Sequence, residues 1–192
     1  MHARLKGALR LFKSFIKRET GVAVVEFALI VPIMLTLYIG SSEAAMLLTV
    51  DRKVQSAAGA MGDLVARSNK TISQAQLDDY FRAATSIMAP YDASKLVQTV
   101  TAVSVDKNSK ATVLWSVRYT NGRLSTTVAE YPKGKVVAIP KEMAAIATGQ
   151  TVISAETSYL YSPAIGVVFN STIDFRRSAL FMPRFGGVID LL

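Results

Sequence analysis

The sequence predicts an α+β protein: a long N-terminal helix followed by a small domain with an antiparallel sheet of about four strands and one or two helices. Three observations support this prediction. Residues 22–40 are almost uniformly apolar, and residues 43–67 continue with a helical period and no proline. Beyond residue 95 the apolar side chains alternate with a period of two, which is typical of strands. A chain of 192 residues has room for one such domain and its attachment.

The apolar run VAVVEFALIVPIMLTLYIG, residues 22–40, holds a single charged side chain, Glu26. A helix rises about 1.5 Å per residue, so this run covers roughly 28 Å, close to the thickness of the hydrocarbon core of a bilayer. Tyr38 lies near its far end, where an aromatic ring suits the membrane interface. We therefore expect a membrane-spanning helix over residues 22–42.

The first 21 residues form a basic segment. Within the first 20 residues there are six basic side chains and one acid, Glu19. The basic residues are Arg4, Lys6, Arg10, Lys13, Lys17 and Arg18. Because positive charge is retained on the cytoplasmic side of a membrane, we expect residues 1–21 inside the cell and the C-terminal part outside the cytoplasm. A nucleic-acid binder would spread its basic residues over a docking face, so we expect no nucleic-acid partner.

Residues 43–68 are expected to continue the membrane helix as an amphipathic helix. The apolar side chains that share one stripe are Leu47, Val50, Val54, Ala57, Met61 and Leu64. Gly59 and Gly62 either weaken this helix modestly or permit close packing. Glu43 is expected to be solvated, at or beyond the far membrane interface.

Residues 69–192 are predicted to form the exported α+β domain. Ser73 and Gln76 have the spacing of a capping box for a second helix, which Pro90 is expected to end. Strand-like alternation covers residues 96–106, 111–119, 151–162 and 171–182, with turns at 107–110 and 121–122 and a short helix at 141–147. The rest of residues 123–150 is irregular and receives no assignment.

Serine and threonine are plentiful in this domain, but the residues that would complete a catalytic site with them are missing. The chain has no cysteine and its one histidine is His2, which excludes a Ser-His-Asp triad or a histidine-ligated metal site in the exported domain. Asp78 and Asp79 could bind a hard cation weakly, but such a pair is expected to form a solvated helix face. The scattered acids show no motif spacing and nothing supports a glycosidase pair among them: Glu130, Glu142, Glu156 and Asp174. The aromatic residues are expected to pack on the sheet, in preference to forming a glycan-binding platform: Trp115, Tyr119, Tyr159 and Tyr161. We therefore expect a non-enzymatic protein with no cofactor, no metal and no small-molecule substrate.

A short motif, GVAVVEF, marks the boundary between the basic segment and the apolar run and contains Gly21, Val22, Glu26 and Phe27. It resembles the prepilin-peptidase site of type IV pilin-like proteins. The continuation GVAVVEFALIVPIMLTLYIGSSEAAMLL resembles the TadE-like proteins of tight-adherence (Flp-type) pilus systems. This resemblance implies cleavage between Gly21 and Val22, and it implies a minor pseudopilin needed for assembly, not the main filament subunit.

The resemblance also implies a role for the acid within the apolar run. Cleavage would expose an α-amine on Val22 next to lipid, and Glu26 of a neighbouring subunit would pair with it, because buried charges persist only when they are paired. Pro32 removes one helix hydrogen bond, and it either bends the span or is simply tolerated there.

These patterns and the resemblance together predict a single-pass inner-membrane pseudopilin that is needed to assemble a Flp-type pilus or a related secretion apparatus. The exported domain would lie in the periplasm or outside the cell. The expected partners are other pseudopilins or pilins of the same system, the prepilin peptidase and the lipids of the inner membrane. Two alternatives stay open: an exported envelope binding domain released by signal peptidase after Ser42-Glu43-Ala44, or the same domain on an uncleaved anchor.

Overall fold

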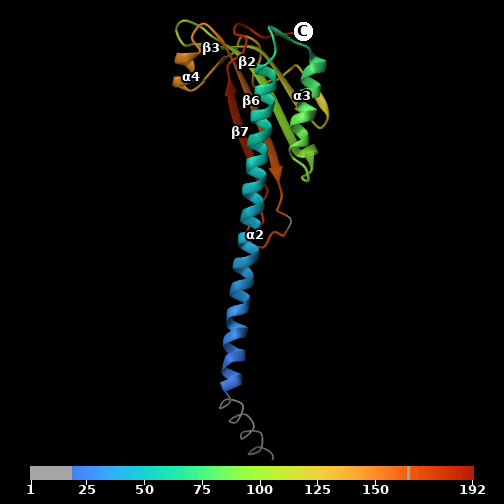
Figure 1. Ribbon diagram of the computed structural model, residues 1–192, viewed down its shortest axis with the longest axis vertical. Helices are drawn as coiled ribbons and strands as arrows, with labels where there is room; N and C mark the ends of the chain where they lie inside the picture. Colours follow the sequence, from blue (N-terminus) through green and yellow to red (C-terminus); the bar gives the residue numbers. More distant parts are fainter. Residues whose placement is uncertain (1–18, 164) are drawn as a thin grey trace, which may run out of the picture. The chain divides into compact units, whose positions relative to one another are not determined.

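The computed structural model describes residues 19–163 and 165–192, and these residues fall into two compact units. The helical unit comprises residues 19–45 and 165–170, and the sheet unit comprises residues 46–163 and 171–192. One helix, α2 (Glu19–Ala66), contributes to both units (Figure 1).

The helix α2 runs without interruption for 48 residues. Its sequence is rich in alanine, leucine and methionine, which favour helix, and its one proline, Pro32, does not break it. The helix ends at Ala66, and Lys70 then adopts a positive φ of 65°, which turns the chain away from the helix direction. The predicted single long helix is therefore confirmed.

In the sheet unit, α2 packs through one apolar stripe. The predicted stripe residues that are fully buried are Val50, Val54, Ala57 and Met61. Leu47 and Leu64 are only partly buried, and Val65 is buried in place of Leu64. The steps between the predicted stripe residues average 3.4 residues, whereas a straight helix has 3.6 residues per turn, so the predicted stripe drifts from the buried one over its length.

The second helix, α3 (Gln74–Ser86), begins with the predicted capping box. The hydroxyl of Ser73 accepts a hydrogen bond from the backbone N–H of Gln76 (3.2 Å), and the Gln76 side-chain oxygen accepts one from the N–H of Ser73 (3.0 Å). The helix ends at Ser86, four residues before Pro90. It buries Leu77, Phe81 and Ala84.

Four long antiparallel strands form most of the main sheet, in the spatial order β3-β2-β6-β7. Their bounds are β2 (Leu96–Val105), β3 (Ala111–Thr120), β6 (Thr151–Tyr161) and β7 (Ile173–Phe181). A short 3-10 helix, η1 (Ala93–Lys95), leads into β2. These bounds lie within two residues of the predicted strands. Alternation of burial is visible along much of β3 and β6, whereas β2, which is paired on both sides, is buried at eight of its ten positions.

Short elements complete the sheet unit. Both β4 (Arg123–Ser125) and β5 (Val136–Val137) pair with β3, and α4 (Lys141–Ile146) occupies the predicted short helix. A separate two-stranded parallel sheet joins β1 (Thr71–Ile72) to β8 (Asp190–Leu191). These strands of two or three residues are too short to show a period of two, so the sequence does not reveal them.

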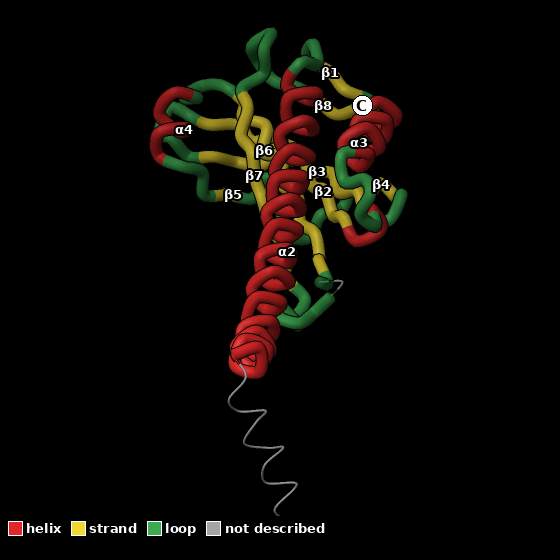
Figure 2. Tube along the Cα trace, turned by 60° about the horizontal axis from the view of Figure 1, so that its bottom comes forward, coloured by secondary structure: helices red, strands yellow, loops and turns green. Residues whose placement is uncertain are grey.

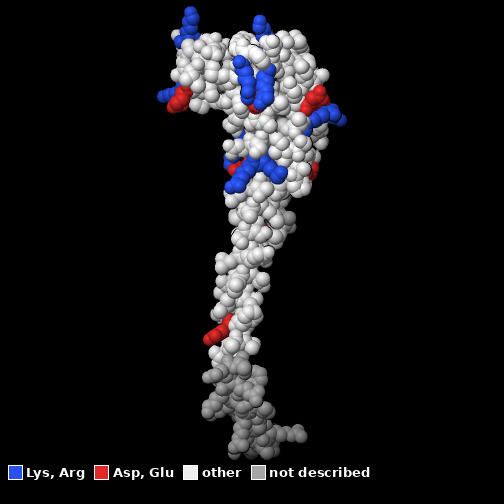
Figure 3. Space-filling view, in the orientation of Figure 1, with Lys and Arg blue, Asp and Glu red and all other residues white. Residues whose placement is uncertain are grey.

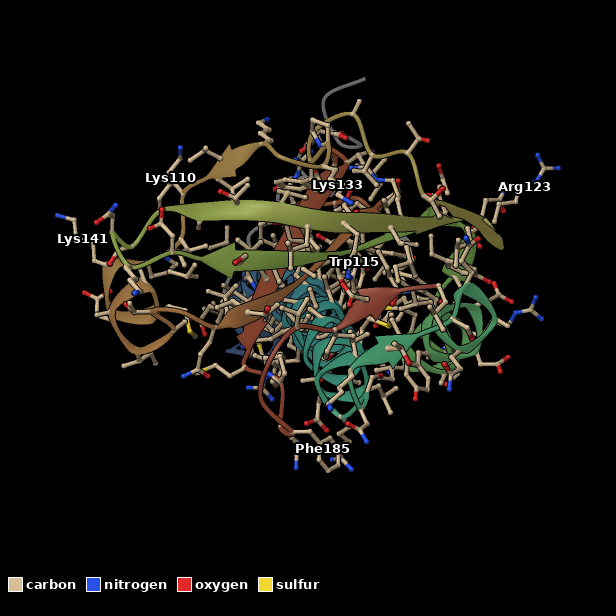
Figure 4. All side chains as sticks on the ribbon, turned by 90° about the horizontal axis from the view of Figure 1, so that it is seen from above. Lys110, Trp115, Arg123, Lys133, Lys141 and Phe185 are labelled. Atoms are coloured by element: carbon tan, nitrogen blue, oxygen red, sulfur yellow. The ribbon has the colours of Figure 1, made fainter. Side chains whose placement is uncertain are left out.

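The hydrophobic core of the sheet unit lies between the helices and one face of the main sheet. In Figure 2, α3 and the second half of α2 lie on this face. The largest core cluster includes Met61, Phe81, Val100, Trp115, Val117 and Ile153. Seen from above, Trp115 lies inside the domain, whereas Lys110, Arg123 and Lys141 extend into solvent (Figure 4). The predicted fold class is therefore confirmed, with short strands added to the four long ones.

Candidate functional site

The first half of α2 exposes apolar side chains along its whole length. Val24, Phe27, Leu29 and Leu37 are between 67% and 71% exposed. Figure 3 shows little charge on this part of the helix. Among the described residues, α2 is the one helix long and apolar enough to cross a membrane. Its length, apolar character and exposure are consistent with a single-pass membrane anchor.

The predicted peptidase motif lies at the beginning of this exposed segment. Gly21, Val22, Glu26 and Phe27 all belong to α2. Glu26 follows Val22 by four residues, which places the two side chains on the same helix face, about 6 Å apart along the axis. The Glu26 side chain is exposed and takes part in none of the ion pairs found among the described residues. A lone carboxylate on an apolar helix is available to a cation from outside this chain.

The side chains expected to determine the topology lie outside the described residues. They are Arg4, Lys6, Arg10, Lys13, Lys17 and Arg18. The one histidine, His2, lies outside them as well. The cytoplasmic location of this segment stays a prediction from its charge.

The helix continues through Pro32. Proline has no backbone N–H, so the carbonyl oxygen one turn earlier lacks its usual donor. One turn later, the hydroxyl of Thr36 donates a hydrogen bond to the carbonyl oxygen of Pro32 (2.8 Å). The Thr36 hydroxyl therefore has a hydrogen-bond partner within the helix, which it needs in lipid, where water is scarce. The helix therefore accommodates Pro32, and a bend at this residue stays a prediction.

The expectation that Glu43 is solvated is wrong. Glu43 belongs to the helical unit and is only 3% exposed. Its carboxylate accepts hydrogen bonds from the backbone N–H groups of Val167 (2.9 Å), Val168 (3.0 Å) and Phe169 (3.0 Å). Three donors replace the water that a buried carboxylate loses. They come from a loop 124 to 126 residues later in the chain, so no local sequence pattern signals this contact.

Four of the acidic residues singled out in the sequence have polar partners in the sheet unit. The pairs are Asp78 with Arg82 (2.8 Å), Glu130 with Arg118 (3.0 Å), Asp174 with Arg176 (2.7 Å) and Glu156 with the hydroxyl of Tyr131 (2.8 Å). Within residues 19–163 and 165–192, no three His, Asp or Glu side chains form a group that could hold a metal ion. Glu130 and Glu156 both act electrostatically on Tyr131, and Glu156 and Asp174 both act on Arg176, so these three acids share neighbours in the sheet unit.

The four aromatic side chains singled out in the sequence are buried in the sheet unit, as predicted. Trp115, Tyr119, Tyr159 and Tyr161 are at most 8% exposed. The ring of Tyr119 stacks on that of Phe81, with 5.2 Å between the ring centroids. These rings contribute to packing in the core, where a sugar ring cannot stack on them.

Comparisons with known proteins bear on the first part of the chain. Neither the curated proteins nor the solved structures gave a match. The family model described as TadE-like protein matches residues 21–60. The matched segment begins at Gly21 and contains Glu26, Pro32 and Glu43. Residues 21–60 are thus a TadE-like segment, as the sequence motif predicts.

Proposed function

We propose that this chain is a membrane-anchored minor pseudopilin needed for the assembly of a tight-adherence (Flp-type) pilus or a related secretion apparatus. The main support for this proposal is that two observations concern the same segment. Residues 21–60 match the TadE-like family model, and residues 22–38 of the same segment present an apolar surface that the chain itself does not cover. Such a surface suits lipid before assembly and the helices of other subunits afterwards.

In this proposal the protein acts by assembling with partners and carries out no reaction. The basic residues between positions 4 and 18 hold the N-terminus in the cytoplasm, and the sheet unit lies on the other side of the inner membrane. The partners are pilins or pseudopilins of the same system, and the prepilin peptidase that processes the chain. The proposal requires no cofactor and no small-molecule substrate.

The proposed role of Glu26 follows from processing. Cleavage of the Gly21–Val22 peptide bond leaves a positive α-amine at the end of an apolar helix. Glu26 of a neighbouring subunit supplies the opposite charge, and opposite charges attract strongly where the dielectric constant is low. Pairing between one subunit's terminal amine and another's carboxylate also sets the axial register of the two helices.

The N-terminus of protein extracted from membranes tests this proposal directly. In cells with an active prepilin peptidase we expect the chain to begin at Val22. Release by signal peptidase would instead give a start at Ala45, and an uncleaved anchor would keep Met1. The matched control is the same strain without the peptidase, in which Met1 is expected. A start at Ala45, or at Met1 in both strains, contradicts the proposal.

A further inference from the structure

The connection between β6 and β7 carries apolar side chains into exposed positions. Residues 162–173 contain no charged side chain. Ile165, Val167 and Val168 are 48%, 58% and 48% exposed, respectively. Apolar side chains that follow one another in an exposed loop favour contact with an apolar partner over contact with water.

The side chain of Glu43 holds this loop by binding the backbone N–H groups of the loop. The carboxylate binds three successive N–H groups, those of Val167, Val168 and Phe169. Gly166, with a φ of +69°, turns the chain immediately before these donors. Hydrogen bonds to a charged acceptor are stronger than neutral ones, so they fix the path of the loop. They also satisfy its backbone donors, which lowers the cost of placing the loop near lipid.

The loop lies beside the end of the apolar run of α2 (Figure 1). A Cβ atom placed on Gly40 would lie 3.2 Å from Cγ2 of Val168, so the helix and the loop are in close contact there. Residues 22–40 cover roughly 28 Å along the helix. If this run spans the hydrocarbon, the next turn, which contains Glu43, lies at the level of the lipid headgroups.

We propose that residues 165–169 insert into the interfacial layer of the membrane leaflet at the C-terminal end of the span. The loop is then a second lipid contact beside the helix; this inference rests on the membrane anchoring in the proposed function. Lipid is the partner that fits, because the loop continues the exposed apolar surface of α2 at the membrane boundary within the same unit. The nearby residues on either side of the apolar tip are polar and uncharged, which suits contact with lipid headgroups: Ser162, Asn170, Ser171 and Thr172.

The absence of cysteine from the sequence makes site-specific labelling possible in the full chain. Val167→Cys carries an environment-sensitive fluorophore in the loop, and Ile165→Cys gives a second position in the same loop. Ile30→Cys reports on the middle of the span, where this side chain is 50% exposed, and Lys107→Cys reports on the turn between β2 and β3. Each labelled protein is reconstituted in phosphatidylcholine vesicles that contain a lipid with a nitroxide either near the headgroup or deep in the acyl chain.

Insertion predicts a depth-dependent loss of fluorescence. The labels at Val167 and Ile165 should be quenched most by the shallow nitroxide, the label at Ile30 most by the deep nitroxide, and the label at Lys107 by neither. If Ile30 is quenched but both loop labels behave like Lys107, the loop does not contact lipid and this inference is overturned, while the membrane anchor stands. If Ile30 is not quenched either, the proposed anchoring itself fails. Proximity between loop labels on two copies, without quenching by lipid, would also overturn the inference.

Discussion

Gly62 of α2 packs directly against the aromatic ring of Phe181, the last residue of β7. A Cβ atom placed on Gly62 would overlap two ring carbons of Phe181 and approach the Cβ of Ala155 to 3.1 Å. At Gly59, one turn earlier, the same atom would meet nothing within 4 Å. The sequence leaves open whether these glycines weaken the helix or permit close packing. At Gly62 the glycine permits close packing.

This difference predicts opposite effects of the same substitution at the two glycines. Gly62→Ala should destabilise the sheet unit by about 1–3 kcal/mol, because the added methyl group overpacks the contact with β7. Gly59→Ala should stabilise it by up to about 1 kcal/mol, because alanine favours helix and the added methyl group meets no obstacle. Urea unfolding in detergent, followed by the fluorescence of the single tryptophan, Trp115, measures both changes. Equal effects at the two positions would contradict the close contact.

The contact of Glu43 with the loop predicts a local change in hydrogen exchange. Glu43→Gln removes the negative charge and one acceptor oxygen, and a hydrogen bond to a charged group contributes about 1.5–3 kcal/mol. The amides of Val167, Val168 and Phe169 should therefore exchange faster, while the amides of the main sheet keep their rates. The matched control is Glu26→Gln, which removes a charge from the same helix without touching the loop. Unchanged exchange at these three amides would show that the carboxylate does not hold them.

The hydroxyl of Tyr131 donates hydrogen bonds to both carboxylate oxygens of Glu156 (2.8 and 3.0 Å). Burial, the hydrogen bond and the negative charge of Glu156 raise the pKa of Tyr131 to about 12. Because the pKa is higher in the folded state than its ordinary value near 10, the contact stabilises the fold fully below pH 10. This contribution should be lost as the pH rises through 12.

An absorbance titration of tyrosinate checks this prediction. Glu156→Gln removes the charge, so one tyrosine should ionise at lower pH than in the unsubstituted protein, and Tyr131→Phe should remove that ionisation altogether. Burial also raises the pKa of Tyr159, so a tyrosine that ionises late need not be Tyr131. Tyr131 is identified by the difference between the titration of Glu156→Gln and that of the unsubstituted protein. Identical titrations for Glu156→Gln and the unsubstituted protein would contradict the assignment.

The proposed pairing of Glu26 with a neighbour's terminal amine predicts that a substitution at Glu26 impairs assembly and leaves membrane insertion intact. Glu26→Ala should leave the protein in the membrane, since it removes the single charge from the apolar run. Co-purification with other pseudopilins of the same system should fall, because the neighbour's amine loses its partner. Glu26→Asp keeps the charge and should retain part of the co-purification. Normal recovery of partners with Glu26→Ala would count against the pairing.

The sequence predicts the long elements well because each has a local physical signal. The capping box of Ser73 and Gln76 marks the beginning of α3, and the alternation of side chains locates β2, β3, β6 and β7. The TadE-like segment also has a local signal, because Glu26 and the apolar run of residues 22–40 lie within a few turns of one helix.

What the sequence does not reveal depends on contacts between distant residues. Glu43 looks like an ordinary solvated acid until the loop of Val167 is placed beside it. The pairing of β1 with β8 joins two-residue segments that lie 119 residues apart in the sequence, since Thr71 pairs with Asp190. Whether a glycine is open or packed, as at Gly59 and Gly62, depends on which strand lies opposite.

The strand order has a consequence for synthesis. The strand β2 pairs on one side with β3, which follows it directly, and on the other with β6, which the ribosome makes much later. Until β6 emerges, one edge of β2 presents unpaired N–H and C=O groups, and such an edge can pair with another chain. We therefore expect the nascent protein to be prone to aggregation until β6 pairs with this edge of β2. A chaperone that binds extended segments would protect it during this interval.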